Sequence, residues 1–329
     1  MSMPMPMDST KRQKEEEEEE EEGLIPGLPD HIAQLSLASL PPKLLFTLSH
    51  SWRRLLYSPT FPPFNCLYAL LAPPHSPSLH FHAYDPLSAT WQALPPPPPE
   101  PPLLLRHPAF LSRSLAVQSI SLGGRLLLLA ATTHNLTPAL PRPLVFHPPS
   151  RSWSHGPPLS PRRWSHAAAW EWQPKAQLRD ARFSREAVDA VGWRGTLCMV
   201  NVKGDAAKEG VVYDVAGDFW KDMPEGMLNG WRGPVAAMEE RLMFVVDEAK
   251  GALRKYIPQQ DAWEDILHNH RLKGAQQLVA HQGKLCVVSP SGISVVDVAA
   301  APPRIFPVKL PEGLEPVAVH VLPRMPLLH

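Results

Sequence analysis

The chain contains little cysteine and carries no net charge. Its three cysteines, Cys66, Cys198 and Cys286, lie far apart among 329 residues, and no CxxC pair exists. A structural zinc site, which is usually built from such pairs, is therefore not expected, and three cysteines do not suit a disulfide framework. We expect a reducing compartment, the cytoplasm or the nucleus.

The balanced charge excludes a further class of partners. The 32 lysines and arginines are matched by 32 aspartates and glutamates, whereas a general nucleic-acid-binding protein needs a basic face. No apolar stretch reaches the ~18 residues of a membrane-spanning helix. We therefore expect neither a nucleic-acid partner nor a membrane partner. The GxSxG, P-loop and GxGxxG motifs of common enzyme classes are also absent.

The first 23 residues are predicted to form a disordered acidic tail. Residues 11–14 (KRQK) are followed by eight glutamates at 15–22, where a signal peptide would place an apolar segment. The glutamates repel one another and bury nothing. The KRQK cluster is either a weak nuclear signal or part of a solvated tail.

Proline is abundant, and a repeated aromatic spacing accompanies it. The 41 prolines are about two and a half times the average usage, which favours short segments and tight loops over long helices. Four times, an aromatic residue is followed seven positions later by tryptophan: Tyr84/Trp91, Phe146/Trp153, Tyr213/Trp220 and Tyr256/Trp263. Turn-forming residues fill each gap. The pairs therefore predict hairpins whose two aromatic side chains pack on one sheet face, as structural residues.

A second repeated element is an apolar strand that follows polar or glycine residues, as in "GGRLLLLA" at 123–130. The leucines at equivalent positions are Leu126, Leu197, Leu242 and Leu285, with Leu67 in the first copy. Together with a further strand, each unit has four strands and repeats at roughly 45–60 residues, which is the requirement of a β-propeller blade. Cys198 and Cys286 directly follow their leucines and are expected to lie in the strand core.

The glycine pair, the Tyr–Trp spacing and the repeat length resemble the kelch repeat. The resemblance covers residues 64–329 and implies a mainly β fold, a kelch-type propeller of five to six blades with four antiparallel strands each. We favour six blades. The terminal blade lacks the aromatic pair, and "PVAVHVL" at 316–322 is expected to complete the first blade, so that strands from both ends of the chain close the ring.

Residues 24–63 differ in pattern from the blades and predict a small helical segment. Asp30 is expected to cap a helix that ends at Ala38, with Ile32 and Leu35 on its inner side. A second helix is expected to begin near Pro42. Its apolar residues recur with helical spacing on one face, at Leu44, Leu48, Trp52 and Leu55.

This segment resembles an F-box. "LPDHIAQLSLASLPP" at 28–42 matches the opening of that family, and "LFTLSHSWRRLLYSPTF" at 45–61 matches its closing helix. The resemblance implies that the segment binds a Skp1-like adaptor and, through it, a cullin. The residues assigned to adaptor binding are Leu28, Pro29, Ile32, Leu35, Leu40, Leu44, Leu48, Trp52 and Leu55.

The whole chain thus resembles a plant F-box/kelch-repeat protein. The resemblance implies a substrate receptor of an SCF-type E3 ubiquitin ligase, which holds an unknown target protein on its propeller and performs no catalysis. The effect would be proximity, because a bound lysine meets the activated ubiquitin at a raised effective concentration. No cofactor or metal is expected.

Three alternatives stay open. The helices could merely brace the propeller, which would then be a scaffold or interaction protein without a ligase role. The propeller could be a metal-dependent enzyme, since "HFH" at 80–82 and "HNH" at 268–270 each place two histidines on one strand face. The proline run at 95–102 is either an exposed linker or a polyproline II ligand.

Loops after the blade tryptophans carry the expected target-binding residues. These are Arg162, Arg163, Trp164, Trp231, Arg232 and Arg271. Arginine and tryptophan are frequent in binding surfaces, and the recurrence places the loops on one face of the propeller. The alternative is that the arginines pair with acidic residues between blades as structural supports.

Overall fold

The computed structural model describes residues 23–74, 79–98, 117–130, 142–158, 165–168, 171–178, 188–201 and 209–325. The predicted acidic tail up to residue 22 and the KRQK cluster lie outside these residues. The chain forms two compact units. Of the described residues, the first unit contains 23–66, 85–90 and 323–325, and the second contains those of 67–84 and 91–322.

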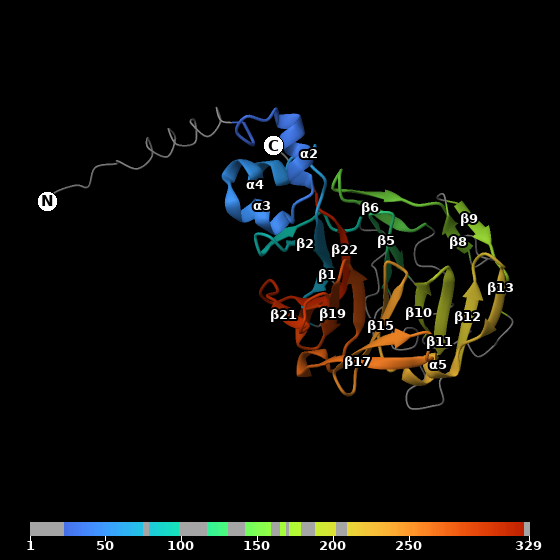
Figure 1. Ribbon diagram of the computed structural model, residues 1–329. Coiled ribbons are helices and arrows are strands. Elements are labelled where there is room, and N and C mark those ends of the chain that lie inside the picture. The colour runs from blue at the N-terminus through green and yellow to red at the C-terminus, as the bar shows by residue number, and fades with distance from the viewer. Residues whose placement is uncertain are drawn as a thin grey trace. The chain divides into compact units, whose positions relative to one another are not determined.

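The first unit holds three short helices: α2 (Asp30–Ala38), α3 (Pro42–Leu48) and α4 (His50–Leu56) (Figure 1). Pro42 takes the first position of α3, where its missing N–H is not needed. The single helix predicted after Pro42 is wrong, because Ser49 is extended (φ −149°, ψ 146°) and separates α3 from α4. Asp30 is not a cap either, since it lies inside α2 and accepts a hydrogen bond from the Leu24 N–H at 3.1 Å.

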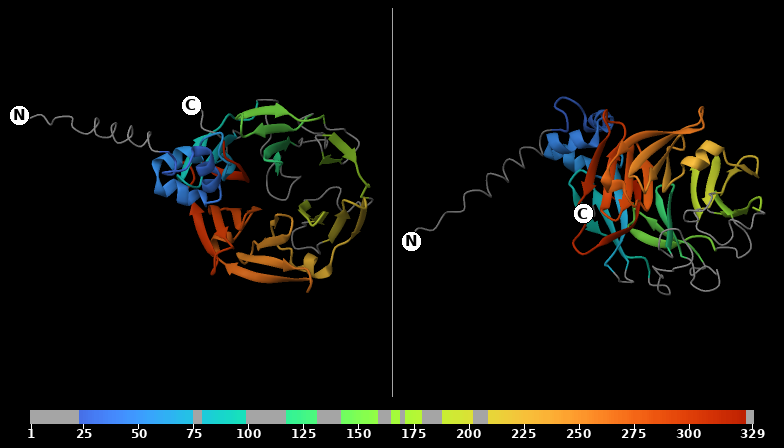
Figure 2. Two further views of the ribbon diagram at one scale, coloured as in Figure 1. Left: turned by 45° about the horizontal axis from the view of Figure 1, so that its top comes forward. Right: turned by 90° about the horizontal axis from the view of Figure 1, so that it is seen from below.

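The second unit is a β-propeller, with antiparallel sheets that follow one another around a ring (Figure 2). Its first sheet has the order β22 (Glu315–Pro323), β1 (Asn65–Ala72), β2 (His80–Asp85) and β3 (Thr90–Ala93). A strand from the C-terminal end thus pairs beside the first strand of the chain. The predicted ring closure by both ends of the chain is confirmed.

The remaining sheets follow in chain order. They are β4 (Val117–Leu122), β5 (Arg125–Ala130), β6 (Leu144–His147) and β7 (Ser152–His155); β8 (Ser165–Ala168) and β9 (Glu171–Pro174); β10 (Val188–Trp193), β11 (Thr196–Asn201), β12 (Glu209–Asp214) and β13 (Phe219–Asp222); β14 (Val235–Met238), β15 (Leu242–Asp247), β16 (Ala252–Ile257) and β17 (Ala262–His268); and β18 (Gln277–His281), β19 (Lys284–Ser289), β20 (Gly292–Asp297) and β21 (Arg304–Val308). Helix α5 (Glu225–Gly230) and the 3₁₀ turn η2 (His270–Leu272) connect sheets.

In the described part of the chain the propeller has five four-stranded blades, within the predicted range of five to six. The sheet of β8 and β9 has two strands among the described residues, so the favoured sixth blade stays a prediction. The last blade is complete, although it lacks the aromatic pair. Val296 of β20 and Ile305 of β21 pair directly in its place.

All four predicted aromatic pairs pack ring against ring, as expected of structural residues. The centroids are 4.9–5.2 Å apart, and Tyr213/Trp220 and Tyr256/Trp263 are direct cross-strand partners. The aligned leucines occupy equivalent strand positions except in one blade, where Leu242 is 45% exposed and the buried Met243 takes the equivalent position. The cause is a longer hairpin: Met238 pairs with Leu242 there, whereas the corresponding turn in the second blade joins Leu122 to Arg125.

Each tryptophan of these pairs also bonds to the preceding sheet in the ring. Its indole N–H donates to a backbone carbonyl in the segment that follows that sheet's outer strand. The bonds run from Trp91 to Lys309 (2.7 Å), from Trp153 to Pro95 (2.8 Å), from Trp220 to Ala176 (2.9 Å) and from Trp263 to Gly226 and Met227 (3.1 Å each). Since Ala176 follows β9, that strand acts as an outer strand in this series.

Two aspartates that are not among the predicted residues complete the contact in two blades. Asp261 accepts the Tyr256 hydroxyl at 2.5 Å and the backbone N–H groups of Gly226 and Met227 at 2.8 and 3.0 Å. Asp218 likewise accepts the Tyr213 hydroxyl and the Ala176 N–H. The signal was present in the sequence, because both aspartates precede the blade tryptophan by two positions.

Apolar side chains fill the space between adjacent sheets. One cluster joins β14–β17 to β18–β21 around Phe244 and Leu285, and another joins β18–β21 to the first blade around Val288 and Val319. Cys198 and Cys286 are buried in such clusters, which confirms them as strand-core residues. Burial raises the pKa of the Cys286 thiol to about 12.

Replacing Trp263 by phenylalanine removes the indole donor while it keeps most of the aromatic packing. We expect the free energy of unfolding to fall by about 1–3 kcal/mol, because two carbonyls lose their partner and some apolar area is lost. Urea unfolding followed by circular dichroism measures the effect. Phe219→Leu, at a 49% exposed position, is the control and should stay within about 0.5 kcal/mol. Equal midpoints for Trp263→Phe and wild type would contradict the assigned role.

The stability that Asp261 contributes should depend on pH. The Tyr256 hydroxyl and the N–H groups of Gly226 and Met227 hold the pKa of this carboxyl below its ordinary value. Its contribution is therefore present above the unfolded-state pKa of about 3.9 and is lost as pH falls through the lower folded-state pKa. Asp261→Asn should destabilise the protein at pH 7, and the difference from wild type should shrink below about pH 4. The exposed Asp222→Asn is the control, and a difference that persists at pH 3 would refute the assignment.

Candidate functional site

The first unit presents an apolar face to solvent. Of the eleven large hydrophobic side chains that are exposed in the described part of the chain, six belong to its short helical segment. They are Leu28, Ile32, Leu35, Leu40, Leu44 and Leu48, with Leu35 at 72% and Leu48 at 60% exposure. Pro29 is exposed beside Leu28. Exposed apolar side chains concentrated in so short a segment indicate a site where another molecule binds. We call these seven residues the apolar helix face.

The helices turn their opposite sides to the core. In α2 the buried residues are Ala33 and Leu37, whereas Ile32 and Leu35 point outward. The expectation that Ile32 and Leu35 form the inner side of this helix is therefore wrong. Since α2 has large aliphatic residues on both sides, periodicity alone does not show which side packs inward.

Two predicted contact residues have an internal role instead. Leu55 is 7% exposed and belongs to the core of the unit. Trp52 is half-buried, and its indole N–H donates to the Leu24 carbonyl at 2.7 Å, which ties the segment before α2 to α4. The break at Ser49 separates both from Leu44 and Leu48, so these four residues do not share one continuous helix face.

A residue near the end of the chain completes this unit. Arg324 is 5% exposed, and its guanidinium donates to the carbonyls of Tyr57 and Ser58 at 3.3 and 2.8 Å, just beyond the end of α4. It also lies 5.6 Å from the ring centroids of Tyr57 and Phe64. A cation at a helix C-terminus is favoured by the free carbonyls and the helix dipole. No sequence signal identifies this role, because 266 residues separate Arg324 from Ser58.

The hydroxyl of Tyr57 donates to the Asp85 carboxylate, which also accepts the Leu87 N–H at 2.7 Å. Burial and this carboxylate raise the pKa of the Tyr57 hydroxyl. Asp85 thus fixes the turn after β2 and in addition orients Tyr57. Together, Arg324 and Asp85 hold the residues after α4 without using the apolar helix face.

The predicted target-binding residues fall into three groups. Arg162, Arg163 and Trp164 lie outside the described residues. Trp231 is fully buried, and its indole N–H donates to the Asp189 carboxylate at 3.2 Å. The prediction that Trp231 contacts a target is therefore wrong, because its side chain fills the core between two blades. Arg232 is exposed and Arg271 is half-buried.

The loops of Arg232 and Arg271 meet at one end of the β14–β17 blade. The Glu248 N–H, in the β15–β16 turn, donates to the Arg232 carbonyl at 3.4 Å, and the Gly274 N–H donates to the Glu248 carbonyl at 2.8 Å. Both loops are thus on the same face, as predicted. In the part of the chain that the structure describes, neither arginine forms an ion pair. No ion pair therefore supports the alternative that these two arginines are structural supports between blades.

Neither histidine pair gathers further metal ligands among the residues that the structure describes. The His80 and His82 rings are 6.3 Å apart, and the pKa of His82 is lowered by burial and by His80. His268 ends β17 and pairs with Asp265, whereas His270 begins η2, so these two do not share a strand face. Within the described residues, no three His, Cys, Asp or Glu side chains gather in a way that would hold a metal ion.

None of the described helices has both the length and the apolar character that crossing a membrane requires. No family model matches the chain. A relative among curated proteins is the "F-box/kelch-repeat protein SKIP25" of Arabidopsis thaliana, which is 46% identical over 355 aligned positions. The alignment covers 92% of the chain and 90% of the relative, so it includes both the helical segment and the propeller.

Replacing the buried Arg324 by methionine should destabilise the first unit. The carbonyls of Tyr57 and Ser58 would lose charged donors, and we expect the free energy of unfolding to fall by about 2–4 kcal/mol. Urea unfolding followed by circular dichroism at 222 nm reports the helices. Arg304→Met, at an exposed position, serves as the control and should change it by less than about 0.5 kcal/mol. A similar midpoint for both variants would show that Arg324 does not hold the helices.

Proposed function

Since the chain belongs to the family of F-box/kelch-repeat proteins, we propose that it is the substrate receptor of an SCF-type ubiquitin ligase. Its helical segment binds a Skp1-like adaptor and, through it, a cullin, and its propeller binds the target protein. The chain itself performs no bond chemistry. It brings a lysine of the target near the activated ubiquitin and raises the effective concentration of the two groups. The cytoplasm or the nucleus is the proposed location.

The apolar helix face is the observation that carries this proposal. Six exposed aliphatic side chains on a segment of fewer than 30 residues are costly in water, at about 25 cal/mol per Å² of apolar area. A partner that covers them recovers this free energy. The face consists of residues 28, 29, 32, 35, 40, 44 and 48, and Trp52 and Leu55 support it from within the unit.

Because buried residues hold the helices together, exposed residues of the apolar helix face can be replaced without unfolding the protein. Leu35 and Leu48 are the two most exposed residues of the face, so a change there leaves the core residues Leu37, Leu45 and Leu56 in place. Replacing Leu35 and Leu48 by aspartate puts two charges where the adaptor must exclude water. Uncompensated burial of a charge opposes binding far more than the loss of apolar area alone.

We expect the double variant Leu35→Asp/Leu48→Asp to lose a Skp1-like adaptor that co-purifies with the wild-type chain after coexpression. The dissociation constant should rise by about a hundredfold or more, as two apolar contacts of about 1.5–3 kcal/mol each are removed. Surface plasmon resonance or calorimetry measures it, and circular dichroism verifies the fold of the variant.

The matched control is Leu242→Asp/Phe306→Asp, which changes two exposed apolar residues of the propeller. This variant should keep the adaptor. If the wild-type chain does not bind a Skp1-like adaptor, the ligase proposal fails and a scaffold role is favoured. Equal loss in both variants would mean that the apolar helix face is not the adaptor site.

A further inference from the structure

Four loops meet at the end of the β14–β17 blade that carries Arg232 and Arg271. The loop before β14 contacts the β15–β16 turn through Arg232 and Glu248, as described above. The Asn269 N–H donates to the Gly251 carbonyl at 2.9 Å, so the loop after β17 meets the same turn. The β19–β20 turn joins them, because the Ser291 hydroxyl donates to the Arg271 carbonyl at 3.3 Å. The loops therefore form one continuous surface of the second unit.

This surface carries four cationic side chains. Arg232, Lys250 and Lys273 are exposed, and Arg271 is half-buried. We call these four residues the cationic loop face. Lys273 lies against the turn of Lys250, because a Cβ added at Gly251 would meet the Lys273 side chain at 2.9 Å.

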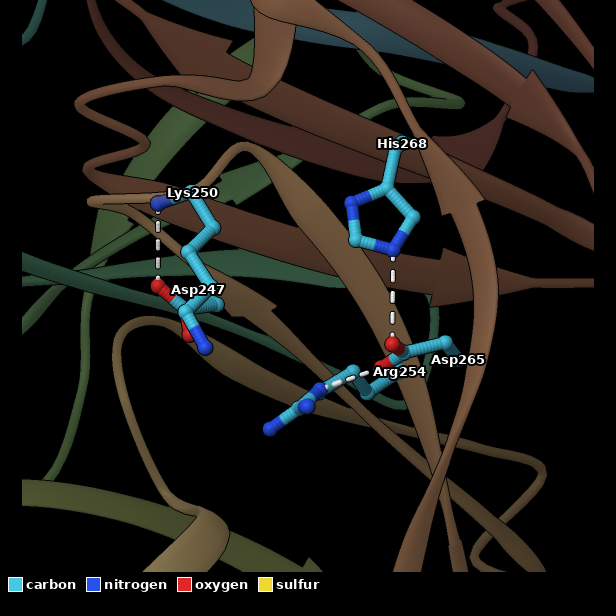
Figure 3. Close-up of polar contacts among 5 residues, drawn as sticks. All are labelled: Asp247, Lys250, Arg254, Asp265 and His268. Carbon is cyan, nitrogen blue, oxygen red and sulfur yellow. Dashed lines mark hydrogen bonds and ion pairs between the residues drawn. The ribbon is translucent and has the colours of Figure 1, made fainter.

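The acidic residues nearby do not neutralise the face. Asp247 is 5% exposed, and its carboxylate accepts the backbone N–H of Lys250 at 3.1 Å, which fixes the turn (Figure 3). Glu248 is the other carboxylate in this turn and is exposed. Among the described residues of these four loops, four cations thus stand against two carboxylates, and one of these two is withdrawn from solvent.

Several charges elsewhere on the same two blades are paired, although Arg241 and Arg304 are not paired with any described residue. Asp265 bonds to Arg254 at 2.5 Å and to His268 at 3.3 Å (Figure 3). Lys255 pairs with Glu264 at 3.5 Å, and Lys284 pairs with Asp297 at 2.6 Å. By contrast, no member of the cationic loop face forms an ion pair with any residue that the structure describes. Because the chain has zero net charge, the positive charge of this cluster is a local feature and does not follow from an overall basic composition.

We propose that the cationic loop face binds an acidic segment of the target protein, one rich in carboxylates or phosphates. This inference rests on the proposed function and names the chemistry of its target. Guanidinium and ammonium groups attract such a segment over several ångströms and form charge-assisted hydrogen bonds with it on contact. Lys250 and Lys273 join Arg232 and Arg271 as target-binding residues, and the buried Trp231 supports the loop from below.

The surface favours an acidic peptide over other ligands. Single-stranded nucleic acid needs exposed aromatic side chains on which its bases stack, but the tryptophan of these loops, Trp231, is 0% exposed. An apolar peptide is also disfavoured. The exposed large hydrophobic residues described in the second unit lie elsewhere, at Ile120, Leu122, Phe219, Leu242 and Phe306.

The test uses the full-length chain and two fluorescent peptides of the same total charge, one of glutamates and one containing phosphoserines, with a glutamine peptide as the neutral probe. Fluorescence anisotropy should show binding of at least one acidic peptide and none of the neutral one. Binding should weaken by about tenfold between about 0.05 M and 0.3 M salt. The acidic peptide that binds more tightly distinguishes carboxylates from phosphates as the source of the charge.

The variant Arg232→Gln/Lys250→Gln/Arg271→Gln/Lys273→Gln should bind the acidic peptide about tenfold more weakly or worse. The control Arg241→Gln/Arg304→Gln removes two exposed cations, one in the β14–β15 turn and one at the start of β21, both at the other end of their blades, and should bind like wild type. Both variants should keep the adaptor, so a failure of this inference can be told apart from a failure of the ligase proposal.

Three results would overturn the inference. The first is equal binding of the acidic peptide by wild type and the fourfold variant. The second is tighter binding of a single-stranded oligonucleotide than of either peptide. The third is a full-length chain that binds neither peptide until residues 1–22 are deleted, since the chain's own glutamates at 15–22 would then be the occupant of the face.

Discussion

The propeller depends on hydrogen bonds that run from the tryptophans of four blades to the sheet before each of them. Ladder hydrogen bonds end at the edge of a sheet, and the apolar packing between adjacent blades has no direction. The blade tryptophans supply the direction: each indole N–H reaches a carbonyl beyond the outer strand of the preceding sheet, as Trp263 does at Gly226 and Met227. The same ring stacks on the aromatic residue of its own hairpin. One side chain thus fixes both the hairpin and its neighbour.

Side-chain hydrogen bonds also hold the C-terminal strand β22, which closes the ring. The Gln277 side chain donates to the Val319 carbonyl at 3.0 Å and accepts the Val319 N–H at 2.7 Å. The buried His320 shares a hydrogen bond with Ser119 at 2.7 Å, and burial lowers its pKa to about 4, so it is neutral at pH 7. Four residues later, Arg324 caps the end of α4. The end of α4 is therefore stabilised by a residue that does not belong to the apolar helix face.

Local patterns predicted the blades well, because the aromatic pair and its turn span eight residues. Features that depend on distant residues were missed. The burial of Trp231 follows from packing between two blades, and Arg324 meets α4 only in the folded chain. In α2, aliphatic residues occupy both sides, so the sequence does not reveal that Ala33 and Leu37 pack inward. The displacement of Leu242 from the buried position has a local cause. Its hairpin is longer by one residue, which moves Met243 to that position.

The two exposed surfaces differ in their physics, and the difference suits the proposed roles. Contacts on an apolar face gain free energy from burial and change little with salt, which fits an adaptor that stays bound while targets are exchanged. Contacts on a cationic face attract their ligand from a distance and are screened within about 10 Å at 0.1 M salt. Such contacts form and release quickly. On this reasoning, a target would be held by the sign of its charge, and adding a phosphate to an acidic segment would strengthen its capture.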